Sequence, residues 1–220
     1  MVQHVYERAL QVPEAQAVLV ATDDVRIRNA VHGFGGRCLM TSPDHPSGTD
    51  RLVEVMAQEE ADIYINLQCD EPLVRPGDIS RLAMGMRADS SVQVGTLCHS
   101  LPAREATNPN TVKVVLAANS DALYFSRAPI PYPRNFDTAH YLKHLGVYAY
   151  RREILLAYSQ LPLPMIEQTE KLEQLRLLAA GFRIRVFEVA PAGPGVDTPQ
   201  CLDRVRALMS PPLHEGARQF

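Results

Sequence analysis

The sequence predicts an α/β protein whose mainly parallel, mixed sheet is covered by helices on both faces and carries a small antiparallel insertion. Two observations indicate this fold class. Segments with helical periodicity alternate with short apolar runs that are typical of buried strands, and such alternation favours a parallel sheet between two helical layers. In the middle of the chain, two apolar runs are separated only by Asn119, Ser120 and Asp121, which predicts a hairpin.

The first half of the chain gives the alternation most clearly. Residues 1–10 form one apolar helical stripe, and the short apolar run at 17–21 predicts a strand. Asp23 and Asp24 are suited to capping the next helix, which is expected to end at the glycines of 33–36. The elements expected after it are a strand at 38–40, a helix at 50–60, a strand at 63–68, a helix after Pro76 opened by Asp78, and a strand at 92–97.

The second half contains the hairpin and a return to helices. The elements expected there are hairpin strands at 111–116 and 122–125, helices at 153–158 and 166–180, a strand at 183–189, and a helix capped by Thr198 that ends at 209. A chain of 220 residues is long enough for one buried core. We therefore expect a single domain at 1–210 and a C-terminal tail at 211–220.

The composition argues against several classes of partner. The 22 basic and 25 acidic residues leave a net charge of −3, so no positive footprint for nucleic acid or an anionic membrane is expected. The cysteines, Cys38, Cys69, Cys98 and Cys201, include no Cys-x-x-Cys pair, which favours reduced, mostly buried thiols over a zinc site or disulfides. The chain contains no targeting pattern and no apolar run of about 20 residues, so we expect a cytoplasmic protein.

Two carboxylates follow predicted strands at points where an α/β sheet binds ligands. Asp70 comes directly after the strand at 63–68, and Asp197 lies in the loop after the strand at 183–189. Each alone is more typical of a turn or a helix cap. Together they match the oxygen ligands of Mg²⁺, which uses one or two carboxylates and completes its shell with phosphate and water.

Other candidate binding residues lie near the ends of predicted elements. Ser47 and Gly48 belong to a loop of small residues before a helix, which suits either close approach of an anion or ordinary capping. A set of polar side chains further along the chain suits a polyhydroxylated acid: Arg127, His144, Tyr148, Glu173 and Gln174. Each of them is also compatible with a structural or solvent-facing role.

Seven segments, read in order, resemble the 3-deoxy-manno-octulosonate (Kdo) cytidylyltransferase family, also called CMP-Kdo synthetase. They are DHPSGTDR at 44–51, NLQCDEP at 66–72, NPNTVKVV at 108–115, YFSRAPIP at 124–131, HLGVYAY at 144–150, EKLEQLR at 170–176 and GVDTP at 195–199. The resemblance extends over residues 1–209 and implies a nucleotidyltransferase fold. It also implies transfer of CMP from CTP to the anomeric 2-hydroxyl of Kdo, with release of pyrophosphate, for lipopolysaccharide biosynthesis.

The resemblance implies roles for individual residues. Mg²⁺ would lie between Asp70 and Asp197, and Arg127 would act with them in catalysis as the partner of an anionic group. The residues implied near the cytidine are Ser47, Gly48, Arg51 and Gln68, and those implied around the sugar acid are Arg127, His144, Tyr148, Glu173 and Gln174. A homodimer built partly from the hairpin at 111–126 is also expected.

The sequence departs from the family pattern at three places. Cys69 stands where the family usually has glycine, and Asp50 where it has glutamate. The resemblance begins after the family's first strand and its phosphate-binding Arg/Lys loop. We therefore expect an N-terminally incomplete domain with an open groove beside its strands, and a reaction with CTP slowed at least about a hundredfold by the lack of those cations. The alternatives are a cytidylyltransferase for 8-amino-Kdo or sialic acid, and an inactive sugar- or nucleotide-binding homologue.

Overall fold

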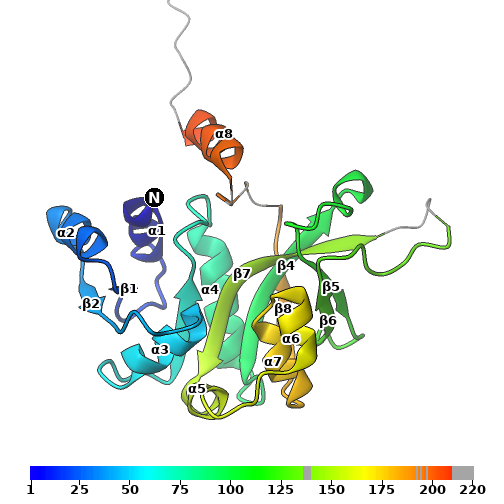
Figure 1. Cartoon of the computed structure of the whole chain (residues 1–220), viewed down its shortest axis with the longest axis horizontal. Coiled ribbons are helices and arrows are strands. Elements are labelled where there is room, and N and C mark those ends of the chain that lie inside the picture. Colours follow the sequence, from blue (N-terminus) through cyan, green and yellow to red (C-terminus); the bar gives the residue numbers. More distant parts are fainter. Residues whose placement is uncertain (136–139, 192, 194, 197, 210–220) are drawn as a thin grey trace, which may run out of the picture.

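The computed structural model describes residues 1–135, 140–191, 193, 195–196 and 198–209. A mixed sheet lies between helices on both sides (Figure 1), which confirms the predicted three-layer α/β/α architecture. The helices are α1 Val2–Ala9, α2 Val25–Gly33, α3 Gly48–Met56, α4 Pro76–Ala88, α5 Arg152–Tyr158, α6 Met165–Glu170, α7 Gln174–Ala179 and α8 Pro199–Met209, with a 3₁₀ turn at Ala103–Glu105. The strands are β1 Val20–Thr22, β2 Cys38–Met40, β3 Ile63–Leu67, β4 Val94–Leu101, β5 Lys113–Leu116, β6 Ala122–Ser126, β7 Tyr141–Arg151 and β8 Ile184–Glu188.

The strand β7 organises the larger sheet. Along one edge it pairs with β4 over most of its length. Along the other it pairs first with β5, at Leu142 and Lys143, and then with β3, from Val147 to Arg151. All three pairings are antiparallel, so β3, β4 and β5 point the same way, and β8 joins them through its parallel pairing with β4. The sheet therefore forks where β3 and β5 meet β7, on either side of residues 144–146.

Two apolar layers hold the sheet between the helices. On one face, α3, α5 and α7 pack through residues such as Met56, Leu155 and Leu175 onto Tyr148 and Tyr150 of β7. On the other face, α4 packs through Ile79, Leu82 and Met86 onto Leu145, Val147 and Ala149. Successive β7 residues thus alternate between the two layers, as the period of two in a strand requires. One consequence is that His144 and Tyr148 point to the same side.

The predicted capping residues are confirmed at several helix starts. Asp24 precedes α2, and its carboxylate accepts a hydrogen bond of 2.7 Å from the Arg26 N–H. Thr198 precedes α8, and its hydroxyl accepts from the Cys201 N–H at 3.2 Å. Pro76 occupies the first turn of α4, where its missing N–H has no intrahelical partner to lose. These local signals explain why most element starts were predictable.

Two parts of the prediction were wrong. The segment at 141–151, which was not predicted as a strand, forms the longest strand of the sheet. The single helix expected at 166–180 is two helices, α6 and α7, because Lys171 adopts a left-handed conformation with φ of 55°. A residue in this conformation cannot continue a right-handed helix and commonly ends one. The break turns α7 so that its first residues face the fork of the sheet.

A second, smaller sheet lies beside the first. Within the described ranges, β1 pairs in parallel only with β2, and no strand joins this pair to β3. A cavity of about 690 Å³ lies between the two sheets and is lined by apolar side chains that include Val5, Val20, Leu52 and Ile65. No helix in the described part of the chain is long and apolar enough to cross a membrane.

Candidate functional site

A large cavity of about 1650 Å³ lies at the fork of the sheet. It faces the carboxyl end of β3, the middle of β7, the start of α3 and the start of α7, which is the kind of position where α/β sheets bind ligands. It brings together most of the predicted site residues: Ser47, Gly48, Gln68, Asp70, His144, Tyr148, Glu173 and Gln174. Arg51 and Arg127 are not among its lining residues.

One wall of the cavity is formed by the start of α3. Ser47 is the N-cap of this helix, and its hydroxyl accepts from the Asp50 N–H at 3.2 Å and donates to the Asp50 carboxylate at 2.6 Å. A Cβ atom on Gly48 would lie only 3.1 Å from Nε2 of Gln68. The absence of a side chain at Gly48 therefore lets the Gln68 amide pack directly against the start of the helix.

Arg51 belongs to the first turn of the same helix and does not line the larger cavity. One nitrogen of its guanidinium lies 3.1 Å from Asp23, and another donates to the Thr41 hydroxyl. Arg51 lines the smaller groove between the two sheets. Gly48 and Gln68 line this smaller cavity as well as the larger one, so Arg51 shares a cavity with two of the residues with which the sequence grouped it.

The carboxylates after β3 lie at the mouth of the cavity. Asp70 and Glu71 both line it, and the backbone carbonyl of Asp70 accepts a hydrogen bond of 2.7 Å from the Val196 N–H. A Cβ on Gly195 would lie 3.1 Å from a carboxylate oxygen of Glu71. The loop at 195–196 is therefore held against the two acidic residues. Asp197 lies outside the described residues, so its convergence with Asp70 stays a prediction.

Cys69, at the position where the resemblance leads us to expect glycine, does not line this cavity. It is exposed and carries a free thiol. No group of three or more His, Cys, Asp or Glu side chains suited to a metal is found among the described residues. A Mg²⁺ site here would accordingly rely on one or two carboxylates and on substrate oxygens.

The opposite wall is formed by β7 and α7. His144 is buried, and burial, assisted by the charge of Lys143, lowers its pKa to about 3. Burial also raises the pKa of the Tyr148 hydroxyl. Both groups are therefore neutral near pH 7, and they can recognise hydroxyl groups by hydrogen bonding rather than by charge.

Several buried polar atoms around the cavity have no hydrogen-bond partner within the described structure. Four of them belong to lining residues: His99 Nε2, Tyr148 Oη, Glu173 Oε2 and Gln174 Nε2. An unpartnered buried polar atom costs about 1 to 3 kcal/mol, and such atoms are rare in folded proteins. Three of these atoms, on Tyr148, Glu173 and Gln174, belong to the wall formed by β7 and α7, which indicates a site suited to a polar ligand.

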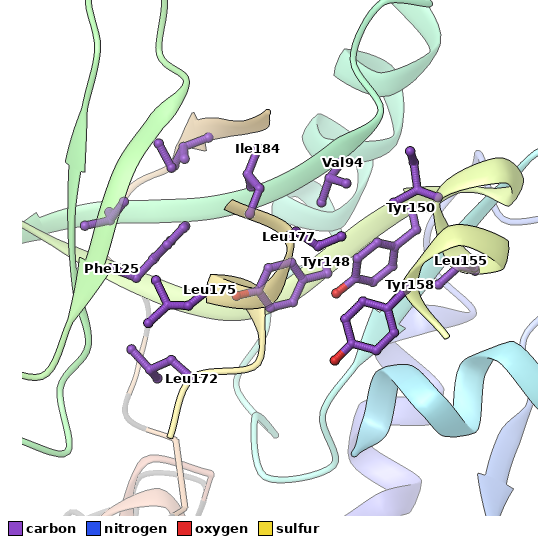
Figure 2. Close-up of a cluster of buried hydrophobic side chains, with 14 of the residues drawn as sticks. Val94, Phe125, Tyr148, Tyr150, Leu155, Tyr158, Leu172, Leu175, Leu177 and Ile184 are labelled. Carbon is purple, nitrogen blue, oxygen red and sulfur yellow. The ribbon is translucent and has the colours of Figure 1, made fainter. Parts of the chain in front are cut away.

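Tyr148, which lines the cavity on the β7 side, stacks on a neighbouring tyrosine of the same strand. The rings of Tyr148 and Tyr150 are stacked with centroids 5.7 Å apart, and Figure 2 shows the hydroxyls of Tyr148, Tyr150 and Tyr158 pointing to the same side. The guanidinium carbon of Arg176 lies 4.6 Å from the centre of the Tyr158 ring. Arg176 is held there by Glu167, with hydrogen bonds of 2.8 and 2.6 Å.

Arg127 does not line the cavity, although its partner Lys171 does. Its guanidinium donates to the backbone carbonyls of Glu170 at 2.8 Å, Pro109 at 3.0 Å and Lys171 at 3.4 Å. The cations that do line the cavity, and that sequence reasoning did not single out, are Lys143, Lys171, Arg176 and Arg204. Two of them, Lys171 and Arg176, lie within the EKLEQLR segment, which was the available signal.

Comparison with known proteins agrees with this geometry. Residues 1–184 match the cytidylyltransferase family. The chain is 63% identical to the 3-deoxy-manno-octulosonate cytidylyltransferase of Escherichia coli, over 99% of this chain and 88% of that protein. It is 46% identical to the enzyme of the same name from Solibacter usitatus, over 98% of this chain and 86% of that protein.

Solved structures give the same result. A structure of CMP:2-keto-3-deoxy-manno-octonic acid synthetase complexed with CTP superimposes with a TM-score of 0.92 at 64% identity, covering 94% of this chain and 86% of the other. A putative glucose-1-phosphate thymidylyltransferase from Bacillus anthracis has a TM-score of 0.62 at 12% identity, covers 94% of this chain and 81% of the other, and shares the fold alone. The chain therefore belongs to the cytidylyltransferase family and, within it, to the 3-deoxy-manno-octulosonate cytidylyltransferases.

Proposed function

We propose that this chain transfers CMP from CTP to the anomeric hydroxyl of Kdo and releases pyrophosphate, which supplies the activated sugar for lipopolysaccharide biosynthesis. The observation that carries the proposal is the cavity at the fork of the sheet, whose walls come from the segments shared with the family. Its volume of about 1650 Å³ exceeds the roughly 300 to 1,000 Å³ of a typical single-ligand pocket. Two substrates can therefore lie in it side by side.

The two walls have different chemistry, which assigns one substrate to each. Beside α3, the Gln68 amide and the open backbone at Gly48 suit the flat, polar edge of cytosine. Beside α7, the neutral groups of His144 and Tyr148, together with Glu173 and Gln174, suit the hydroxyls of a sugar acid. Holding both substrates in one cavity brings the sugar hydroxyl to the α-phosphorus, and positioning supplies much of the rate in phosphoryl transfer.

Pyrophosphate release tests this assignment. The chain is incubated with CTP, Kdo and Mg²⁺, and phosphate is measured after addition of pyrophosphatase, with parallel reactions that lack Kdo or contain UTP or sialic acid instead. We expect release above the enzyme-free rate only with CTP and Kdo together. Equal release with sialic acid would contradict the assignment of the sugar, and release without any sugar would contradict a transferase.

A requirement for Mg²⁺ is part of the proposal. Asp70 and Glu71 offer hard oxygen ligands at the cavity mouth, and Asp197 is the second ligand that the sequence predicts. When bound, the ion would offset the phosphate charge and stabilise the charge that develops on the leaving group. Lys143 lines the same cavity beside His144, where it would balance the sugar carboxylate.

Binding of Mn²⁺, followed by electron paramagnetic resonance, tests the metal site without relying on activity. We expect Asp70→Asn to weaken Mn²⁺ binding in the presence of CTP by at least about tenfold. The matched control is Glu153→Gln, which removes an exposed carboxylate at the start of α5 and should leave binding unchanged. Unchanged Mn²⁺ affinity in Asp70→Asn would contradict the assignment of this ligand.

We also propose a homodimer that uses the β5–β6 hairpin. Within the described ranges β6 is an edge strand, paired along its length only with β5, and its Leu123 is 62% exposed. An exposed apolar edge strand favours pairing with another chain. Light scattering should give twice the mass of one chain at micromolar concentration. The substitution Leu123→Glu should lower the measured mass toward that of a single chain. A single-chain mass for the unmodified protein would refute the dimer.

A cytoplasmic location completes the proposal. The four cysteines are all free thiols, which agrees with a reducing compartment. Localisation of a tagged full-length protein by cell fractionation tests this expectation. Recovery in a periplasmic or membrane fraction would contradict it.

A further inference from the structure

The strand β7 contains an irregularity where it passes the cavity. Thr96 of β4 lies opposite Tyr148, but the next residue, Leu97, lies opposite Leu145. Gly146 and Val147 of β7 therefore have no partner on β4. Insertions of this kind bend a strand and re-aim its side chains, and they often occur next to active sites.

The hydroxyl of Thr96 fills this irregularity. Thr96 is fully buried, with 0% of its surface exposed. Its oxygen lies 2.8 Å from the carbonyl of Val147 and 3.3 Å from that of Leu145. The same oxygen lies 3.0 Å from Nε2 of His144.

The number of protons decides how these contacts are made. A threonine hydroxyl has one proton, and both carbonyls can only accept it. If Nε2 of His144 were unprotonated, three acceptors would surround that one proton. If Nε2 carries the ring proton, the hydroxyl donates to the carbonyls and accepts from His144, and every group is satisfied.

We infer that Thr96 is a positioning residue that holds His144 in the Nε2–H tautomer and so leaves Nδ1 as a hydrogen-bond acceptor at the cavity. Nδ1 has no hydrogen bond within the described residues, although His144 lines the cavity. Phe125 and Tyr148 fix the ring from both sides, with centroids 5.0 and 5.3 Å away. The low pKa of His144, caused by burial, keeps the ring from gaining the second proton that would abolish the acceptor.

The ligand of this acceptor is a hydroxyl donor, and its identity as a sugar hydroxyl rests on the proposed function. A neutral imidazole acceptor discriminates between hydroxyls and carboxylates, because a carboxylate has no proton to donate near pH 7. Thr96 therefore contributes to selectivity without contacting the substrate. Its contribution is made through the orientation and tautomer of one ring.

Two-bond ¹H–¹⁵N correlation spectra of the histidine-labelled chain test the tautomer without any substrate. The chain has seven histidines, and the spectrum of His144→Gln identifies the signals of His144 by their loss. In the unmodified protein we expect the ¹⁵N chemical shift of His144 Nε2 to be that of a protonated ring nitrogen, and the shift of Nδ1 to be that of an unprotonated one. The reverse pattern, or an averaged one, overturns the inference whatever the activity of the protein.

Two substitutions test the role of the hydroxyl. Thr96→Ser retains it and should keep the Nε2–H pattern. Thr96→Val removes it and should give a mixed or reversed pattern, together with a KM for Kdo raised about tenfold and a KM for CTP unchanged, as for one lost hydrogen bond. The matched control is Thr22→Val, a buried strand threonine in β1 that should leave the His144 signals unchanged.

The outcomes separate this inference from the proposed function. If Thr96→Val does not fold, the unmodified protein and Thr96→Ser still decide the tautomer. If the pattern is found but Kdo is not a substrate, the inference stands and the proposed sugar is wrong. If Thr96→Val keeps the Nε2–H pattern and the KM for Kdo, Thr96 has no positioning role.

Discussion

The ion pair between Glu167 and Arg176 permits a quantitative prediction about the wall of the cavity. The side chains of Glu167 and Arg176 are only 9% and 13% exposed. The two hydrogen bonds between them are 2.8 and 2.6 Å long, and they raise the pKa of Arg176 above its ordinary value. The pair is therefore buried and specifically oriented.

Replacing Glu167 by glutamine removes the charge and keeps most of the shape. Arg176 is then left almost buried without a counter-ion, and breaking such a pair from one side costs about 3 to 5 kcal/mol. The contact with the Tyr158 ring is present before and after the substitution, so it does not compensate for the lost counter-ion. We expect the free energy of unfolding to fall by about 3 kcal/mol, a large share of the roughly 5 to 15 kcal/mol of a typical domain.

Urea unfolding followed by circular dichroism measures this loss, since the chain has no tryptophan for fluorescence. The matched control is Glu59→Gln, which opens the exposed pair with Arg37 and should cost about 1 kcal/mol or less. Replacing both members of the buried pair by apolar residues, Glu167→Leu with Arg176→Met, should recover most of the stability. A loss for Glu167→Gln no larger than that of the control would refute the reasoning.

Three further predictions follow from single side chains. The pKa of His144 in the folded protein, about 3, lies below its ordinary value of 6.5, so between these pH values the unfolded chain binds more protons and stability falls as the pH is lowered, by up to about 1.4 kcal/mol per pH unit. Between pH 6 and pH 5 the urea midpoint should therefore fall less in His144→Gln than in the unmodified protein, and an equal fall in both would contradict this. Gly48→Ala places a Cβ 3.1 Å from the Gln68 amide and should raise the KM for CTP about threefold to tenfold while the thermal midpoint stays the same or rises; an unchanged KM would count against Gln68 as a base contact. Lys113 is fully buried, and its ammonium donates to three backbone carbonyls. The substitution Lys113→Met should lower the free energy of unfolding by about 3 kcal/mol, and a loss below about 1 kcal/mol in urea unfolding would show that the carbonyls find other partners.

The sequence predicted which loops line the larger cavity better than it predicted the strand between them. Asp70 follows a short apolar strand, and Ser47 is the N-cap of a helix. Both signals are local in the sequence. The strand β7 has no such signal, because its first half exposes Lys143 and His144 to the cavity. Its extended conformation depends on pairing with β3, β4 and β5, which are distant in the chain.

Arg127 shows a different limit. Its charge and its place in the YFSRAPIP segment indicated an anion-binding group, and in the fold three carbonyls from two distant segments accept three of its five guanidinium N–H donors. Competition of this kind cannot be read from a sequence, because it depends on which backbone groups lack partners. The break at Lys171 belongs to the same class, since lysine has no preference for a left-handed conformation.

Thr96 was missed because nothing in its immediate sequence distinguishes it from other strand threonines. Its role depends on the two residues of β7 that lack partners on β4 and on the histidine two positions before them. The glycine at 146 was a weak local sign of this irregularity. The prediction of function was nevertheless reliable, because the ligand-binding segments match the family as a set even where single roles differ.

We propose that the α-phosphorus of CTP and the anomeric oxygen of Kdo are joined in the cavity at the fork of the sheet. This reaction can be followed by ³¹P nuclear magnetic resonance in a mixture of the chain, CTP, Kdo and Mg²⁺. We expect loss of the triphosphate signals and equal growth of pyrophosphate and of one phosphodiester, which mass spectrometry identifies as CMP linked to Kdo. Formation of free CMP with pyrophosphate, or a phosphodiester that appears equally in the absence of Kdo, would contradict it.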